Sequence, residues 1–365
     1  MGRVTETRSG FQSIKQFGEA LLFQLGRDIP VHSGARRRFQ SDLARRLPHN
    51  TFKPWQKACL RRFRPLLCAG LTAASAILPA SAQQQAAKLK VVTTFSILRD
   101  FAGNVGGDRV EVTTLVGSNG DVHVYTPTTG DAEMIRNARL VVINGLGLEG
   151  WLPRLVKSSG SNATVAVATH GIVPRKVTVG EILSRDRGAG SVDPHGWQSV
   201  ANAKVYVANI RDAMVAADPA DAATYKANAS AYLAKLEALD HDVRQALASI
   251  PVQRRMVIST HDAFGYFAAA YDITFVAPEG VSTETEPSAR DIATIITQIK
   301  KEKIPAVFLE NVSDPRLMRQ IASETGAAIG GTLYSDSLTD EKGEAPSYIE
   351  MVRHNIRTIA SALME

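Results

Sequence analysis

Cysteine is nearly absent from this chain. Of its 365 residues only Cys59 and Cys68 carry a thiol, and both lie in a front segment that we expect to be removed. The remaining protein would then have neither a disulfide nor a thiolate ligand. A chain of this size can bury enough apolar surface to fold without disulfides. Any metal site must therefore be built from imidazole and carboxylate groups.

Long apolar runs are also absent. The longest candidate, residues 65–79, is shorter than the roughly 20 residues that span a bilayer. It follows an arginine-rich segment at 61–64 and precedes Ala80-Ser81-Ala82, a small-x-small cleavage site. This order is typical of a secretory signal rather than of a transmembrane anchor or a buried helix. We predict a signal peptide over residues 61–82, cleaved after Ala82, and an exported, periplasmic protein.

Two features of the front segment need separate interpretation. Cys68 would suggest a lipoprotein, but Leu67 precedes it where a small residue is expected. Residues 1–60 are rich in arginine and lack a clear hydrophobic period. We interpret them either as an upstream over-extension of the reading frame or as a disordered extension, and leave them out of the fold prediction.

The excess of basic over acidic residues is confined to the front of the chain. Residues 1–82 hold 14 of the 42 Lys and Arg residues but only 4 of the 36 Asp and Glu residues. The remainder is therefore slightly acidic, although the whole chain has a pI near 9.3. Without a basic domain, the sequence gives no support for nucleic-acid binding.

The rest of the chain alternates strand-like and helix-like segments, which predicts parallel sheets covered by helices. An uninterrupted helical pattern over 220–250, ended by Pro251, divides two such runs, and their starts at 90–95 and 255–261 resemble each other weakly. We predict two similar α/β lobes with mostly parallel sheets, at 88–219 and 251–365, joined by one long rigid backbone helix. Strands are expected at 89–94, 108–114, 140–144, 163–168, 255–259, 273–276, 306–309 and 327–333. Helices are expected at 96–105, 201–217, 263–271, 289–303, 315–325 and 348–363, and a further helix is expected to start at Thr126-Pro127, with Asp131 in its first turn.

Four candidate metal ligands each follow an apolar run. They are His123, His195, His261 and Asp336, separated by 72, 66 and 75 residues. Three imidazoles and a carboxylate make a complete four-ligand set for a divalent transition metal. No local finger spans such gaps, so the fold must bring the four together. A single histidine in isolation is more often a surface or structural residue, and Asp336 alone would be a loop or capping residue.

Acidic residues beside these candidates have alternative roles. Asp121 and Asp193 precede their histidines by two residues and are either turn-formers, which we favour, or acceptors that orient an imidazole. Asp262 is expected to cap a helix rather than to bind metal. The remaining histidines have no matching partners and are expected to be solvated or to lie in the discarded segment: His32, His49, His170, His241 and His354.

The motifs around these residues resemble one known family. From about Lys88 to the end, the chain resembles the periplasmic metal-binding proteins of zinc/manganese ABC importers, the cluster A-I solute-binding family (bacterial solute-binding protein family 9). The motifs are Asp121-x-His123-x-Tyr125-x-Pro127, Asn144 to Trp151, Asp193-Pro-His195-x-Trp197, Thr260 to Phe267, and Asp336-Ser337-Leu338. The resemblance implies that His123, His195, His261 and Asp336 bind the metal, and that two α/β lobes are joined by one helix.

The chain departs from the family's subgroups in two places. Many zinc-specific members carry a long His- and Asp-rich loop between the first two ligands, whereas residues 169–193 hold only His170. Many manganese members have glutamate at the third ligand, whereas this chain has His261. Imidazole favours zinc over manganese. We therefore expect Zn²⁺ as the transported ligand, with Mn²⁺ as the alternative.

These observations predict an exported, soluble, monomeric solute-binding protein without catalytic activity. Its expected partners are an inner-membrane ABC permease and the permease's cytoplasmic ATPase. Two alternatives remain open. One is a surface adhesin on the same fold, and the other is a zinc-dependent hydrolase. The hydrolase would need an open metal position and a general base, for which Glu310 is the first candidate, and the chain has no His-Glu-x-x-His motif.

Overall fold

The computed structural model describes residues 87–177 and 190–364. The predicted signal peptide, the extension before it, both cysteines, His32 and His49 lie outside the described residues, as does most of the polar segment that precedes His195. Two four-stranded sheets, each with all strands parallel, form the core of the described chain. None of the described helices is both long enough and apolar enough to cross a membrane.

The N-terminal lobe contains the first sheet, with strand order β2-β1-β3-β4. Helix α2 follows β1 directly and buries its apolar face against the sheet and against α5 and α6. Helix α3 begins with a capping box, in which Thr128 and Asp131 satisfy each other's backbone N–H groups. The elements are β1 (Leu89–Phe95), α2 (Ser96–Gly106), β2 (Val110–Val116), α3 (Thr129–Asn137), β3 (Leu140–Ile143), α4 (Leu152–Ser159) and β4 (Thr164–Val167).

The C-terminal lobe repeats this plan with strand order β6-β5-β7-β8. Helix α8 also begins with a capping box, here between Ser288 and Asp291. The elements are β5 (Met256–Ile258), α7 (Gly265–Tyr271), β6 (Thr274–Val276), α8 (Ala289–Glu302), β7 (Ala306–Glu310), α9 (Pro315–Thr325), β8 (Ala328–Leu333) and α10 (Tyr348–Met364). The two lobes are therefore similar α/β units, as predicted.

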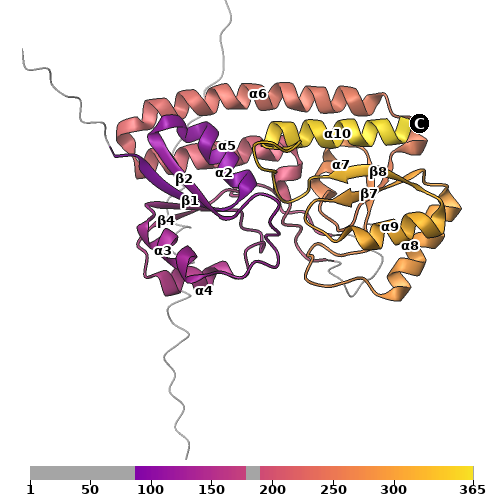
Figure 1. Cartoon of the computed structure of the whole chain (residues 1–365). Coiled ribbons are helices and arrows are strands. Elements are labelled where there is room, and N and C mark those ends of the chain that lie inside the picture. Colours follow the sequence, from indigo (N-terminus) through magenta and orange to yellow (C-terminus); the bar gives the residue numbers. More distant parts are fainter. Residues whose placement is uncertain (1–86, 178–189, 365) are drawn as a thin grey trace, which may run out of the picture. The chain divides into compact units, whose positions relative to one another are not determined.

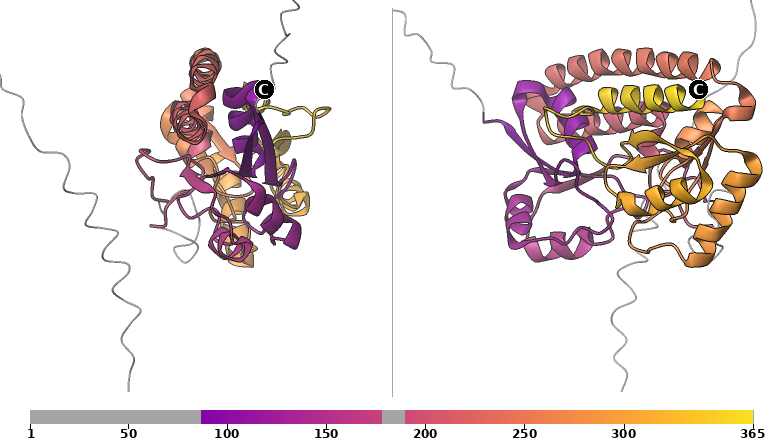
Figure 2. Two further views of the ribbon diagram at one scale, coloured as in Figure 1. Left: turned by 90° about the vertical axis from the view of Figure 1, so that its left-hand side faces the viewer. Right: turned by 45° about the vertical axis from the view of Figure 1, so that its right-hand side comes forward.

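Helix α6 (Ala222–Ala248) runs along both lobes, with α10 beside it (Figures 1 and 2). It lies two residues inside each end of the predicted helix, and the short 3₁₀ turns Pro219–Asp221 and Val252–Arg254 flank it. Helix α5 (Val200–Ala217) packs antiparallel beside α6, since only a short turn joins them.

Buried contacts tie α2 to α5, α6 and α10. The Phe101 ring packs against Tyr206, Tyr232 and Tyr348, with centroid distances of 5.9, 6.3 and 4.8 Å. Next to it, Asp100 Oδ2 accepts hydrogen bonds from the Tyr232 hydroxyl and the Tyr348 backbone N–H. One continuous apolar core therefore includes residues of both lobes and holds them together along their helical side.

Two local predictions differ from the structure. Helix α4 was not predicted, although Pro153 in its first turn and the left-handed Gly160 at its end are standard boundary signals. The second strand begins at Val110 rather than at 108, because Gly107–Arg109 forms a 3₁₀ turn. Both differences concern short segments, in which helical periodicity is too brief to stand out.

Candidate metal centre

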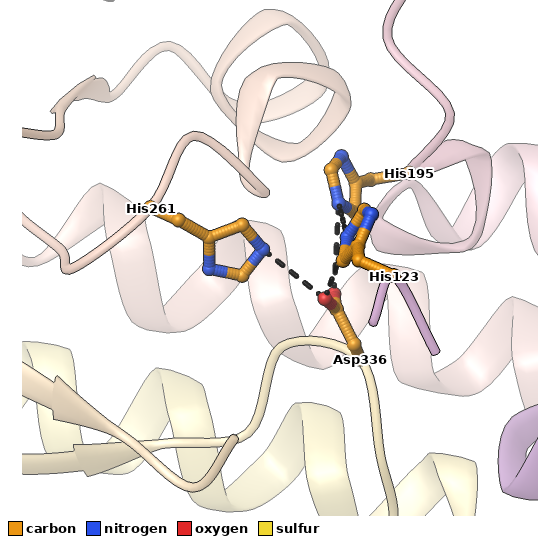
Figure 3. Close-up of side chains that lie close together, drawn as sticks. All are labelled: His123, His195, His261 and Asp336. Atoms are coloured by element: carbon orange, nitrogen blue, oxygen red, sulfur yellow. Dashed lines mark hydrogen bonds and ion pairs between the residues drawn. The ribbon is translucent and has the colours of Figure 1, made fainter. Parts of the chain in front are cut away.

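The four side chains singled out in the sequence lie together in a buried cluster between the lobes (Figure 3). Their potential ligand atoms all lie within 4.8 Å of one another. The Asp336 carboxylate is central: its Oδ2 lies 3.2 Å from His123 Nε2 and 3.1 Å from His261 Nε2, and its Oδ1 lies 3.7 Å from His195 Nε2. The Nε2 atoms of His123 and His195 are 3.3 Å apart. Three imidazoles thus direct the same ring nitrogen toward one carboxylate.

Each lobe contributes two of the four residues. His123 lies on the loop after β2, and His195 immediately precedes the 3₁₀ turn Gly196–Gln198. His261 follows β5, and Asp336 follows β8. Because the strands of each sheet are parallel, their carboxyl ends lie at one edge, where ligand sites of α/β folds commonly form. The two sheets present these edges to each other across the cluster.

The loop with His123 is held by the motif that ends at Trp151. The Trp151 indole donates to the Val122 carbonyl at 3.0 Å and packs edge-on against Tyr125. Asp121 Oδ1 accepts the backbone N–H of His123 at 2.8 Å, so Asp121 is the turn-former that we favoured. Its Oδ2 accepts from the Thr283 hydroxyl of the opposite lobe at 2.6 Å.

Asp193 orients His195 and also forms the turn before it. Its Oδ1 lies 2.9 Å from both the backbone nitrogen and Nδ1 of His195. The ring contact assigns the proton to Nδ1 and leaves Nε2 as the free donor atom, a usual arrangement for metal-binding histidines. The sequence prediction offered these two roles as alternatives, and the structure combines them. Asn144 adds support by donating to the Pro194 carbonyl at 2.9 Å.

Glu310 at the end of β7 performs the corresponding role for His261. Its Oε2 lies 2.6 Å from His261 Nδ1, and its Oε1 accepts the backbone N–H groups of Thr260 and His261 at 2.7 and 2.9 Å. We had named Glu310 only as a possible general base of a hydrolase. The available signal was its position at the end of a strand beside the strand that precedes His261, but strand order is not evident from sequence.

The buried charges perturb one another strongly. Burial by itself would lower the pKa of His261, but the carboxylates of Glu310 and Asp336 hold that pKa well above its ordinary value. Burial would raise the pKa of Asp336, but His261 and His195 hold it well below its ordinary value. The centre therefore favours an imidazolium–carboxylate pair, and a metal ion that bound through His261 would have to displace its proton.

Solvent reaches the four-residue cluster from the side of His123. His123 is 8% exposed, whereas the other three residues are fully buried. A cavity of about 600 Å³ adjoins His123, and its lining includes Tyr125, Leu148 and Trp151. Solvent thus reaches the cluster at the side of His123.

Two predictions about neighbouring residues are wrong. Asp262 does not cap a helix: α7 begins at Gly265 without a side-chain cap, and Asp262 Oδ2 is buried without a hydrogen-bond partner. Burial also raises the pKa of Asp262 to about 6. His354 is half-buried rather than solvated, since it packs on Tyr334 and its Nε2 lies 3.0 Å from the Thr332 carbonyl. His170 and His241 are exposed, as expected.

Such a centre can bind a metal ion more readily than it can catalyse hydrolysis. Within the described residues, this set is the only group of three or more His, Cys, Asp or Glu side chains with suitable spacing. Four protein ligands would complete a tetrahedral shell and leave no position for a reactive water. Glu310, the base that a hydrolase would need, is already engaged with His261 and two backbone amides.

Comparison with known proteins agrees with this geometry. Residues 91–362 match the family described as zinc-uptake complex component A, periplasmic. The iron-binding protein YfeA of Yersinia pestis is 38% identical over 75% of this chain and 86% of its own length. The manganese ABC transporter substrate-binding lipoprotein PsaA of Streptococcus pneumoniae is 32% identical over 78% of this chain and 91% of its own.

Solved structures show the same architecture. The periplasmic zinc-binding protein TroA of Treponema pallidum aligns with a TM-score of 0.69 and 31% identity over 76% of this chain and 99% of its own. The three named relatives differ in their metal, so the family does not by itself specify one. From its matched residues, its fold and its relatives, the chain belongs to the zinc-uptake component A family of metal ABC transporter substrate-binding proteins.

Proposed function

We propose that this protein captures a divalent transition metal, preferentially Zn²⁺, between its two lobes and delivers it to an ABC importer. His123, His195, His261 and Asp336 are the proposed ligands. The observation that carries the proposal is the convergence of three Nε2 atoms on one buried carboxylate. Two of the imidazoles are each oriented by a carboxylate of their own, His195 by Asp193 and His261 by Glu310. Export to the periplasm and partnership with a permease and its ATPase are part of the proposal, supported by the family.

The chemistry of the donors favours zinc. Imidazole nitrogen binds Zn²⁺ more strongly than Mn²⁺, whereas added carboxylate shifts the balance toward Mn²⁺. This centre has three imidazoles and one carboxylate, which matches a closed tetrahedral zinc shell. We therefore propose Zn²⁺ as the preferred cargo and Mn²⁺ as the weaker alternative.

Release requires that at least one ligand move away from the ion. The loop that carries Asp336 is tied to the N-terminal lobe: the Ser335 carbonyl accepts hydrogen bonds from Trp197 and Gln198, and the Leu338 N–H donates to Ser96. The side chain of Asp336 is thereby anchored to the lobe that carries His123 and His195. We propose that His261, on the other lobe, is the ligand that separates first.

Metal competition on the purified protein tests the proposal. One equivalent of Zn²⁺ should remain bound in native mass spectrometry when Mn²⁺ is present in excess. His123→Ala should lose this zinc, whereas His170→Ala, which removes an exposed histidine, should retain it. Equal retention of zinc by both variants would rule out the proposed ligand set, and preferential retention of manganese by the unaltered protein would overturn the choice of metal.

A further inference from the structure

The two carboxylates that orient imidazoles of the centre are supported in different ways. Glu310 is held by two backbone N–H groups just after β5. Asp193 accepts the backbone N–H of His195 through Oδ1, whereas its Oδ2 faces the guanidinium of Arg175, whose Nη1 lies 3.2 Å away. A positive charge therefore stands behind the carboxylate that orients His195, and the proposed ligand set does not account for it.

Arg175 is fixed to Asp193 through its backbone as well. Residues 175–177 pair antiparallel with residues 190–193, and in this ribbon the Arg175 carbonyl accepts the Asp193 N–H at 2.9 Å. The Arg175 side chain is 18% exposed, and the Asp193 side chain is fully buried. Because little water reaches this ion pair, its attraction is screened less than at the surface, and removing one partner leaves the other charge uncompensated.

Helix α7 of the opposite lobe covers the ion pair. The Arg175 N–H donates to the Tyr266 hydroxyl at 2.9 Å. Gly265, the first residue of α7, lies so close that a Cβ atom there would stand 2.6 Å from Asp193 Oδ2 and 2.7 Å from Arg175 Cζ. Real Cβ atoms essentially never approach other atoms within 3.0 Å, so glycine is what allows α7 to pack here. The C-terminal lobe thus closes over the support of a ligand on the N-terminal lobe.

A further buried carboxylate lies beside the ion pair. Asp262 is buried, and its Oδ2 has no hydrogen-bond partner within the described chain. Burial raises the pKa of Asp262 to about 6; Asp193 raises it further, and Arg175 lowers it. Without the guanidinium, Asp193 and Asp262 would face each other as like charges in a site with little water. Arg175 therefore offsets a repulsion that would otherwise act on the carboxylate of Asp193.

We propose that Arg175 is a positioning residue of the metal centre. Its guanidinium holds Asp193 Oδ2, so that Oδ1 stays directed at Nδ1 of His195 and the Nε2 of His195 stays directed at the ion. Arg175 acts one step farther from the ion than Asp193, so we expect its effect on zinc affinity to be about tenfold, the lower limit for residues that orient a metal-binding histidine. The inference rests on the proposed cargo site, because it concerns how one of the proposed ligands is held.

A double-mutant cycle on the full-length protein tests this role. Competition with a chromophoric chelator measures the zinc affinity of Arg175→Gln, of Asp193→Asn and of the variant with both changes. Arg175→Gln should weaken zinc binding about tenfold when Asp193 is present. It should weaken zinc binding less than about twofold in Asp193→Asn, because Arg175 acts through Asp193. An equal loss in both backgrounds, or no loss in either, would overturn the proposal.

Arg255→Gln is the matched control for loss of a buried guanidinium. The Arg255 side chain is 16% exposed, pairs with Asp272 and donates to the Ile250 carbonyl, away from the metal centre. Its replacement should lower the thermal unfolding temperature and leave zinc affinity unchanged. If Arg255→Gln lost as much zinc affinity as Arg175→Gln, the affinity would report general destabilisation, and the assignment to Arg175 would be wrong.

Two further variants complete the design. Arg175→Lys keeps the positive charge that faces Asp193, so it should recover part of the affinity lost in Arg175→Gln, and it takes the place of that variant in the cycle if circular dichroism shows that Arg175→Gln does not fold. His195→Ala tests the cargo site separately. Zinc binding by His195→Ala as tight as that of the unaltered protein would refute the cargo site, whereas loss of zinc in His195→Ala but not in Arg175→Gln would refute only the role of Arg175.

Discussion

Each lobe has a buried glutamate that accepts backbone N–H groups at the carboxyl edge of its sheet, and the two glutamates differ in what else they touch. Glu149 accepts the backbone N–H groups of Asn144 and Gly145, just after β3, and the Thr94 hydroxyl of β1. Glu310 likewise accepts two amides just after β5. Only Glu310 also contacts an imidazole of the centre, at 2.6 Å from His261 Nδ1.

The comparison separates a structural role from a functional one. Parallel strands leave amides without partners where they end, and a buried carboxylate can satisfy several of them. In the N-terminal lobe this satisfaction is the whole role, and burial raises the pKa of Glu149 despite the hydrogen bonds that oppose the shift. In the C-terminal lobe the same arrangement also sets the tautomer and charge of His261. A shared feature of the fold has thus become part of the metal centre on one side only.

The largest effect is expected where the lobes meet. Asp336 is the one residue of the set that approaches all three imidazoles. Asp336→Ala should lower zinc affinity by more than about a hundredfold, which exceeds the usual cost of losing an outer supporting residue. Competition with a chromophoric chelator measures the affinity, and the exposed Asp340→Ala serves as the control. A similar affinity in both variants would contradict the proposed ligand set.

Replacing each of the two glutamates by glutamine in turn tests the comparison between the lobes. Glu310→Gln should lower zinc affinity by about 10- to 100-fold, because His261 loses its orienting carboxylate. Glu149→Gln should leave zinc affinity nearly unchanged and lower the free energy of unfolding by about 1–3 kcal/mol, because an amide N–H₂ then faces a backbone donor. Calorimetric titration and urea unfolding of both variants give the two quantities. If Glu149→Gln changed affinity as much as Glu310→Gln, the distinction between the lobes would be lost.

The stability of the metal-free protein should depend on pH through His261 and Asp336. The pKa of His261 is raised well above 6.5, so its contribution to metal-free stability is complete below pH 6.5 and is lost as pH rises through the raised value. The pKa of Asp336 is lowered well below 3.8, so its contribution is present above pH 3.8 and is lost as pH falls through the lowered value. The pair therefore stabilises the metal-free protein most between these limits.

Zinc and the proton of His261 compete, so zinc affinity should be low where His261 is protonated. It should rise with pH as His261 releases its proton, with about one proton released per zinc at pH 7. Glu310→Gln should release fewer protons, since one of the two carboxylates that raise the pKa of His261 is gone. Calorimetry in buffers of different ionisation enthalpy measures the number. Equal release in both proteins would show that Glu310 does not control the proton.

The smallest expected effect concerns the capping boxes that the two lobes share. Thr128→Ala at the start of α3 and Ser288→Ala at the start of α8 should each lower the free energy of unfolding by about 1 kcal/mol. Neither residue approaches the centre, so zinc affinity should be unchanged. Thermal unfolding with and without zinc compares the pair. A loss of affinity in Thr128→Ala alone would show that the loop with His123 depends on α3.

Local patterns predicted much of this fold. The alternation of strands and helices and the long helix α6 follow from the spacing of apolar residues, which recur every two residues in strands and about every four in helices. Such spacing can be recognised within a short segment of sequence. The four candidate ligands stood out because each follows an apolar run, and the structure brings them together. Helix α4 escaped prediction because eight residues hold barely two turns.

The sequence by itself determined the residue types available to the centre, the α/β class and the turns that Asp121 and Asp193 form two residues ahead of their histidines. Only the tertiary structure decided that Glu310 supports His261 across 49 residues of chain and that Asp336 joins a loop of the other lobe. The physical reason is that burial and partnership depend on strand order and lobe packing, which arise from contacts between distant segments.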